Sequence, residues 1–218
     1  MEFGIGAGWM RSDYDAAGMS YDRPGERIER MLESIEIIRG LFGDGPVAFA
    51  GEHYTITGLD GRPKPVQSPP PLLIGGGGKR MLGIAARQAD NVGITANLRA
   101  GEIGPDAAAD ITPARFDETL RWVRDAAGDR MADIELNSLV MSTQVVDDQQ
   151  AAIDGTAALF GLDPADAAAS PILLLGSPDQ IVQQLEERRD RWGFSYFIVQ
   201  GVDTAIALEP VVARLAGN

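Results

Sequence analysis

Four consecutive glycines, Gly75, Gly76, Gly77 and Gly78, separate a short apolar segment from the basic pair Lys79 and Arg80. Because glycine has no Cβ, such a backbone can turn sharply and approach a ligand closely. If a helix begins directly after the turn, the unpaired N–H groups of its first turn and its dipole attract an anion. We therefore predict a phosphate site at these six residues. A tight turn followed by two solvated cations is the simpler alternative, and the spacing matches neither a Walker loop nor a Rossmann fingerprint.

A second glycine pattern lies at the beginning of the chain, where Gly4, Gly6 and Gly8 alternate with apolar residues before Trp9. In a strand, alternate residues share one face, so glycines there leave room for a planar ring against the backbone. Trp9 would then stand where this strand ends. A core tryptophan above a closely packed strand would give the same pattern.

The segments that must position these residues alternate between strand and helix. We expect strands at residues 2–8, 72–74, 90–95, 134–146 and 194–199, and a small hairpin outside the main repeat at 46–58. Helices are expected at residues 24–41, 79–88, 113–127, 149–160, 163–169, 178–192 and 206–216. Short apolar strands separated by helices are typical of a parallel sheet covered by helices. No linker divides the five strand–helix units, so we expect a single domain over residues 1–218.

Composition excludes several classes of function. The chain has 218 residues, 44% of them hydrophobic, with a formal net charge of −13, no cysteine and one histidine, His53. A strongly acidic surface repels nucleic acid, and no apolar run reaches the roughly 20 residues of a membrane helix. We also see no signal peptide. Disulfides and multi-histidine metal sites are excluded, and the absence of cysteine favours a reducing cytoplasm.

Several motifs in order give the sequence a family resemblance. They are Gly-Ala-Gly-Trp at 6–9, the helix at 23–39, Gly-Glu-His-Tyr at 51–54, Pro-Lys-Pro-Val-Gln at 63–67, Pro-Pro-Leu-Leu-Ile-Gly-Gly-Gly-Gly at 70–78, residues 85–90 and Gly-Ser-Pro-Asp-Gln-Ile at 176–181. This order resembles the luciferase-like monooxygenase superfamily, and most closely its branch of coenzyme F420-dependent oxidoreductases. The similarity extends from Phe3 to the end of the chain.

The resemblance implies a TIM (β/α)8 barrel with a cofactor at the carboxyl ends of its strands. It implies that the cofactor phosphate meets Gly75–Gly78, Lys79 and Arg80, and that Gly6, Gly8 and Trp9 lie against the ring. Thr95 and Asn97 correspond to contacts with the cofactor tail, Arg99 is a weaker candidate, and His53 lies on the hairpin insertion. The cofactor implied is coenzyme F420, with FMN as the alternative, and the substrate is a small organic molecule of unknown identity. Relatives are often homodimers.

In this family the glycine-rich strand is the fourth, so the resemblance implies that three preceding strand–helix units are missing. We therefore expect a partial barrel whose first and last strands are exposed apolar edges, which invite aggregation or pairing. Met1 would be an internal or misassigned start, the gene would be a fragment, or a dimer would complete the sheet in trans. The catalytic residues are unknown. A non-catalytic remnant, or another barrel enzyme that binds a sugar phosphate at the same loop, would be alternative functions.

Overall fold

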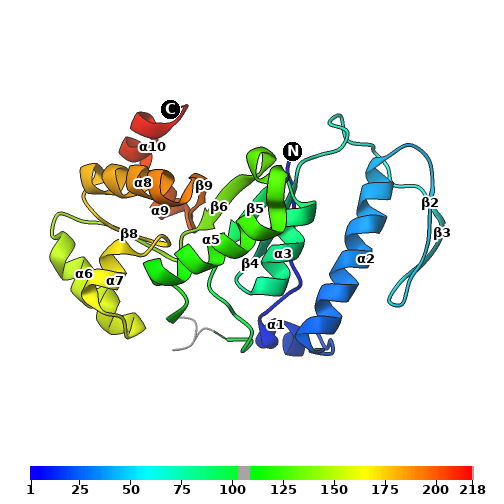
Figure 1. Cartoon of the computed structure of the whole chain (residues 1–218), viewed down its shortest axis with the longest axis horizontal. Helices are drawn as coiled ribbons and strands as arrows, with labels where there is room; N and C mark the ends of the chain where they lie inside the picture. Colours follow the sequence, from blue (N-terminus) through cyan, green and yellow to red (C-terminus); the bar gives the residue numbers. More distant parts are fainter. Residues whose placement is uncertain (103–108, 218) are drawn as a thin grey trace.

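The computed structural model describes residues 1–102 and 109–217. A five-stranded parallel sheet lies at its centre, with α3 and α5 packed against it, and α2 and a hairpin to one side (Figure 1). In spatial order the strands are β1 (Phe3–Ile5), β4 (Leu72–Gly76), β5 (Asn91–Ile94), β6 (Glu135–Leu139) and β9 (Phe194–Ile198). The predicted α/β class with a parallel sheet is therefore confirmed, and β1 and β9 form its two edges.

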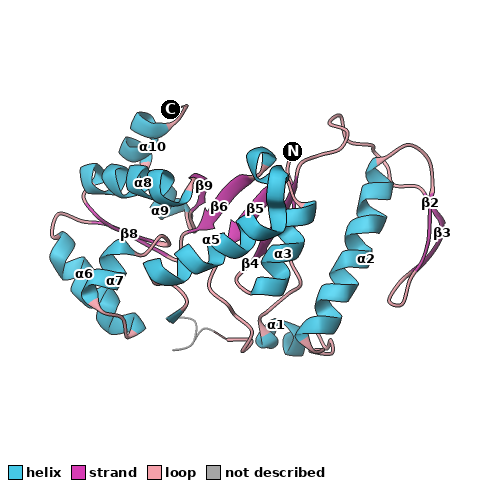
Figure 2. Cartoon of the chain, in the orientation of Figure 1, coloured by secondary structure: helices cyan, strands magenta, loops and turns pink. Residues whose placement is uncertain are grey.

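The strand order places the crossover helices on one face of the sheet. Each new strand joins the same side of its predecessor, and parallel crossovers are almost always right-handed. The helices that follow the first four strands of the sheet include α2 (Pro24–Phe42), α3 (Lys79–Gln88), α5 (Pro113–Ala127) and α8 (Pro178–Trp192). Ile74, Val92 and Ile94 point into this helix-covered layer and are 0% exposed. Figure 2 shows α3 and α5 in front of the magenta strands.

Local sequence signals account for the helix boundaries that were predicted correctly. Thr112 caps α5 through its side chain, and Pro113 occupies the first turn. Ser177 and Gln180 form a reciprocal capping box at the start of α8, and Gly193 ends that helix in the left-handed conformation. These are the arrangements that satisfy orphan backbone groups at helix ends.

The hairpin expected near residues 46–58 is confirmed as antiparallel strands β2 (Val47–Ala50) and β3 (Thr55–Leu59). It lies on the outer side of α2, away from the sheet (Figure 1). The carboxylate of Glu33 on α2 accepts hydrogen bonds from three backbone N–H groups of the turn. The donors are Glu52 at 2.7 Å, His53 at 3.0 Å and Tyr54 at 3.0 Å. A Cβ on Gly51 would lie 2.4 Å from that carboxylate, so a larger residue there would displace the Glu33 side chain from its three donors.

The first strand is shorter than predicted. It ends at Ile5 rather than at residue 8, and Gly8 has a φ of 72°. That conformation is accessible to glycine and incompatible with a continuing strand. A six-residue helix, α1 (Arg11–Ala16), follows where no element was predicted.

The end of the chain differs from the expected single helix at 206–216. It forms α9 (Val202–Ala207) and α10 (Glu209–Leu215), which meet at Leu208. Pro210 lacks an N–H and its ring clashes with a preceding carbonyl, so a continuous helix through it is disfavoured.

A second small parallel sheet was also missed. The expected β-rich segment at 134–146 is divided into β6 and β7 (Ser142–Val145), and β7 pairs with β8 (Leu173–Gly176). Helices α6 (Gln149–Phe160) and α7 (Pro164–Ala169) connect these two strands, and a 3-10 helix at Gly128–Asp133 precedes β6. The apolar run at residues 172–175 was the signal for β8, and its four side chains are at most 1% exposed. Within the described ranges, no helix is both long and apolar enough to cross a membrane.

Candidate functional site

The glycine loop after β4 packs directly against the end of the neighbouring strand. Thr95 donates its backbone N–H to the Gly76 carbonyl at 3.1 Å. A Cβ on Gly77 would lie 2.3 Å from the Ala96 carbonyl oxygen, so no larger residue fits without moving backbone. At Gly78 a Cβ would lie 4.0 Å from the amide group of Asn97. The structure therefore brings Gly76–Gly78 together with Thr95 and Asn97, two groups that the sequence singled out separately.

Helix α3 begins at this loop without a side-chain cap. Its N-cap is Gly78, and within residues 1–102 and 109–217 no side chain bonds to its first turn. By contrast, Thr112 caps α5 and Ser177 caps α8. An N-cap side chain typically contributes about 1 kcal/mol of stability. The N-terminus of α3 forgoes that contribution and leaves its first-turn N–H groups available to an anion.

The two cations of this turn point toward the neighbouring helices. The Lys79 ammonium lies 6.0 Å from the centre of the Trp122 ring on α5. Arg80 pairs with Glu29 on α2 at 3.0 Å, and both side chains are about half exposed, at 53% and 52%. Exposed ion pairs contribute about 0–1 kcal/mol, so an anionic ligand could compete with Glu29 for Arg80.

Glycines form a row beside this loop, in β4, in β5 and directly after the end of β1. Gly75 pairs in register with Gly93, and Gly6 comes directly after Ile5, which pairs with Ile74. A Cβ on Gly93 would lie 3.3 Å from the Gly75 Cα, a tight contact that the neighbouring backbone could relieve only by a small shift, whereas a Cβ on Gly75 would lie 3.9 Å from the Gly93 carbonyl oxygen. The row leaves a floor of bare backbone, which suits a flat ring. Sequence reasoning missed Gly93, although its position one residue before the end of β5 was a usable signal.

The loop after β5 is held by an acidic residue further along the chain. Asp110 accepts the backbone N–H of Asn97 at 3.2 Å and forms an ion pair with Arg115 at 2.8 Å. The Asn97 side chain accepts the N–H of Arg99 at 3.2 Å, while the Arg99 side chain is exposed. The backbone of Asn97 is thus fixed beside Gly78.

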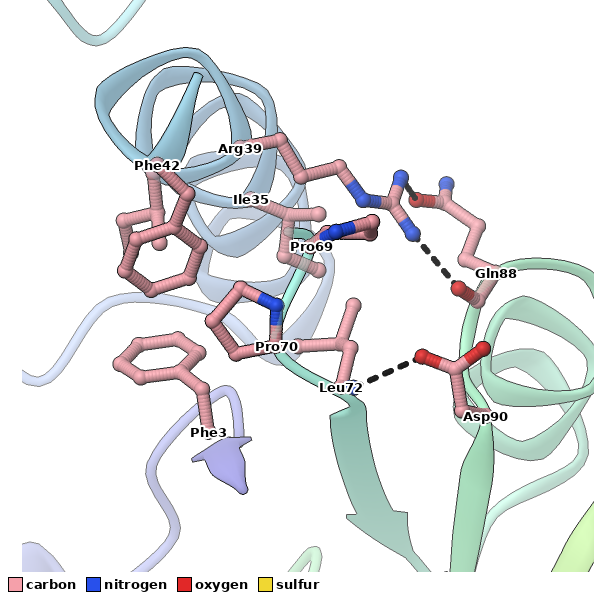
Figure 3. Close-up of a pocket in the computed structure, with 10 residues that line it drawn as sticks. Phe3, Ile35, Arg39, Phe42, Pro69, Pro70, Leu72, Gln88 and Asp90 are labelled. Atoms are coloured by element: carbon pink, nitrogen blue, oxygen red, sulfur yellow. Dashed lines mark hydrogen bonds between the residues drawn. The ribbon is translucent and has the colours of Figure 1, made fainter. Parts of the chain in front are cut away.

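Other candidates lie elsewhere. His53 belongs to the hairpin turn on the outer side of α2, so it is not grouped with the glycine loop. A pocket of about 130 Å³ opens between α2, β1 and β4 (Figure 3). Phe3 and Leu72 begin their strands there, so this pocket lies at the amino ends of the strands, whereas the glycine loop lies at their carboxyl ends. In the described part of the chain, no group of three or more His, Asp or Glu side chains could hold a metal ion.

A family model covers most of this chain, and two curated proteins match parts of it. Residues 1–160 match the family model of the luciferase-like monooxygenases. Over 84 residues the chain is 38% identical to the uncharacterized protein Rv0940c of Mycobacterium tuberculosis, a match that covers 38% of this chain and 28% of that protein. Over 74 residues it is 30% identical to an FMNH(2)-dependent dimethylsulfone monooxygenase of Pseudomonas putida, covering 34% of this chain and 20% of that enzyme. The matched stretches thus span less than a third of these curated relatives.

Solved structures share the fold over nearly the whole chain. The monooxygenase RslO1 from Streptomyces bottropensis superimposes with a TM-score of 0.68 at 20% identity, covering 99% of this chain and 67% of that one. The coenzyme F420-dependent tetrahydromethanopterin reductase from Methanopyrus kandleri superimposes with a TM-score of 0.69 at 18% identity, and the match covers 96% of this chain and 72% of the reductase chain.

Proposed function

Because this chain belongs to the luciferase-like monooxygenase family, we propose that it binds a flavin or deazaflavin cofactor at the carboxyl edge of its sheet and serves an oxidoreductase reaction there. The single observation that carries the proposal is the uncapped start of α3 at a glycine loop in which Gly77 packs too closely on the neighbouring backbone to accept a Cβ. In this proposal the first-turn N–H groups, with Lys79 and Arg80, bind the cofactor phosphate.

The ring system would lie on the glycine row formed by Gly6, Gly75 and Gly93. A Cβ at Gly6 would meet nothing within 4 Å, and one at Gly75 would make only an ordinary contact at 3.9 Å, so the absence of side chains at these two positions leaves space for a flat ligand over the backbone. Trp9, which is half-buried just after β1, would border the ring, and Thr95 and Asn97 would border the tail. These residues bind and orient the cofactor and help to exclude water from it.

The cofactor we propose first is coenzyme F420, and FMN is the alternative. When bound, a deazaflavin supplies hydride transfer, and a reduced flavin can in addition activate oxygen. F420-dependent enzymes are among the structural neighbours, and an FMNH(2)-dependent monooxygenase is among the sequence relatives. The substrate we propose is a small organic molecule.

Direct titration tests the proposal. Coenzyme F420 and FMN, each oxidised and reduced, are added to the 218-residue chain, and the change in cofactor fluorescence gives the Kd. Saturable binding of one of them, weakened by added inorganic phosphate, is the expected result. Failure of both to bind at concentrations up to those that saturate a longer relative would refute the proposal for this chain.

A further inference from the structure

Three consecutive carbonyl groups after β1 are each held by a different side chain. The Tyr14 hydroxyl donates to the Ala7 carbonyl at 3.5 Å, and the Tyr21 hydroxyl donates to the Trp9 carbonyl at 2.8 Å. Between them, the Arg27 guanidinium donates to the Gly8 carbonyl. In a β-strand, successive carbonyls point to opposite sides and bond to neighbouring strands. Here side chains take the place of a neighbouring strand and fix the path of the segment that ends in Trp9.

The three donor side chains form one cluster, which we name the carbonyl clamp. The rings of Tyr14 and Tyr21 meet edge to face, with centroids 5.2 Å apart. The Arg27 guanidinium lies 4.4 Å from the Tyr21 ring centre and donates to the Tyr21 hydroxyl at 3.3 Å. Moving one donor therefore disturbs the other two.

Arg27 is the unusual member of the clamp. It is only 5% exposed, and in the described part of the chain it forms no ion pair and its Nε has no hydrogen-bond partner. Burying a cation without a carboxylate is costly, so a position that retains one has a specific need for its donors. Its partners are a carbonyl, a hydroxyl and two aromatic rings.

The clamp also joins the loops that flank the glycine loop. Arg11 covers the outer face of Tyr21 at 4.3 Å and donates its backbone N–H to the Gly101 carbonyl at 3.0 Å. Gly101 lies in the connection after β5, while Arg11 follows β1. Because β4 lies between β1 and β5, the two loops meet around the end of the strand that carries the glycine loop.

From this arrangement we propose that Arg27 and Tyr21 are positioning residues, which hold Gly8 and Trp9 in the geometry that receives the ring of the cofactor. This inference rests on the proposed function. Neither residue touches the reacting atoms. They act through the backbone, by fixing two carbonyls that a flexible loop would leave free, and thereby lower the entropy lost on binding.

Two conservative variants test the inference with a matched control. Tyr21→Phe keeps the ring between Arg11 and Arg27 but removes the hydroxyl that reaches Trp9. Arg27→Lys keeps the charge but cannot serve both Gly8 and Tyr21 with the same planar geometry. The control is Arg30→Lys, one turn further along α2, where the side chain pairs with Asp22 and is 31% exposed. Each variant is studied in the 218-residue chain by urea unfolding, cofactor titration and tryptophan emission.

The emission of Trp9 is isolated by subtracting the spectrum of the matching Trp9→Phe protein, since the chain has three tryptophans. We expect each clamp variant to raise the cofactor Kd at least about fivefold, which corresponds to one ordinary hydrogen bond. The Trp9 emission should shift toward that of an exposed indole in the absence of cofactor, at a temperature where every variant is fully folded. The control should change neither quantity.

Suppose that the wild-type chain binds a cofactor and that the clamp variants have the same Kd and the same Trp9 emission as the wild type. That result would overturn the inference and leave the proposed function intact. A loss of affinity explained by the unfolded fraction alone would also overturn it. A wild-type chain that binds neither cofactor would instead refute the proposed function, and the inference with it.

Discussion

The side chain of Tyr196 on β9 interacts with the carboxylate of Glu2, which immediately precedes β1 on the opposite edge of the sheet. A flat sheet of five strands would separate its outer strands by about 19 Å, because neighbours lie about 4.8 Å apart. Two side chains cannot span that distance. The sheet must therefore be curved enough to bring its two edge strands closer together than they would lie in a flat sheet.

Titration of Tyr196 tests this contact across the sheet. Burial, and then the negative charge of Glu2, raises the pKa of Tyr196 above its usual value of 10.0. The neutral phenol is the form the fold favours, so its stabilising effect is present below pH 10 and is lost as the pH rises through the raised pKa. Tyrosinate absorbance should therefore include a component from Tyr196 that titrates above pH 10. It should disappear in Tyr196→Phe and titrate earlier in Glu2→Gln. An unchanged titration in Glu2→Gln would contradict the contact.

The hairpin should loosen in acid because one carboxylate holds its turn. Desolvation acts to raise the pKa of Glu33, but the N–H groups of His53, Glu52 and Tyr54 outweigh it, and the net pKa lies below 4.5. The anchoring is therefore complete above that pH and is lost as the pH falls through the lowered pKa. Hydrogen exchange should show the protection of these three amides falling in that range. Glu33→Ala should remove the protection at neutral pH, whereas Glu36→Ala, on the same helix, should leave it unchanged.

Gly77 and Gly78 should respond differently to alanine. At Gly77 the added Cβ would collide with the Ala96 carbonyl, so Gly77→Ala should destabilise the fold by about 1–3 kcal/mol in urea unfolding. At Gly78 the nearest atoms are 4.0 Å away and the backbone is extended, so Gly78→Ala should fold like the wild type.

Gly78→Ala should nevertheless weaken cofactor binding about tenfold, because its methyl group covers the start of α3 (1.4 kcal/mol per factor of ten). Gly155→Ala, on α6 with nothing within 4 Å of the added Cβ, provides the control. If both variants bind the cofactor equally well, the glycine loop is not the phosphate site.

Arg188 should be the arginine of α8 on which stability depends. It is 3% exposed and donates to the carbonyls of Ser170 and Leu173, which position β8. Burial lowers its pKa to about 10, which still leaves it charged at neutral pH. Arg188→Met should cost about 2–3 kcal/mol, because two buried carbonyls lose their donor. The Arg191 side chain is 48% exposed and forms an ion pair with Asp117. Arg191→Met removes this pair and should cost under about 1 kcal/mol. Equal costs in urea unfolding would contradict this account.

The sequence predicted elements well where a periodic pattern was bounded by a local signal. Helix α3 was predicted with its observed bounds, because the glycine loop marks its start, and α5 and α8 carry proline and capping residues at theirs. The prediction failed at residues 6–8, where side chains of Tyr14 and Arg27 replace the neighbouring strand. Such a distant hydrogen bond leaves no periodic trace in the sequence.

The candidate site was predicted in pieces. The glycine loop, Thr95 and Asn97 were identified separately, and the structure shows that Gly77 packs on the backbone between those two residues. Gly93 and the carbonyl clamp were missed, since both depend on strand register and on long-range contacts rather than on local composition.

A crystal structure of the chain with coenzyme F420 or FMN bound would test the central claim most directly. We predict that a phosphate oxygen lies within hydrogen-bond distance of the backbone N–H groups at residues 79–81, with the ring over Gly75 and Gly93. A cofactor bound with its phosphate elsewhere, for example in the pocket beside Phe3 and Phe42, would contradict it.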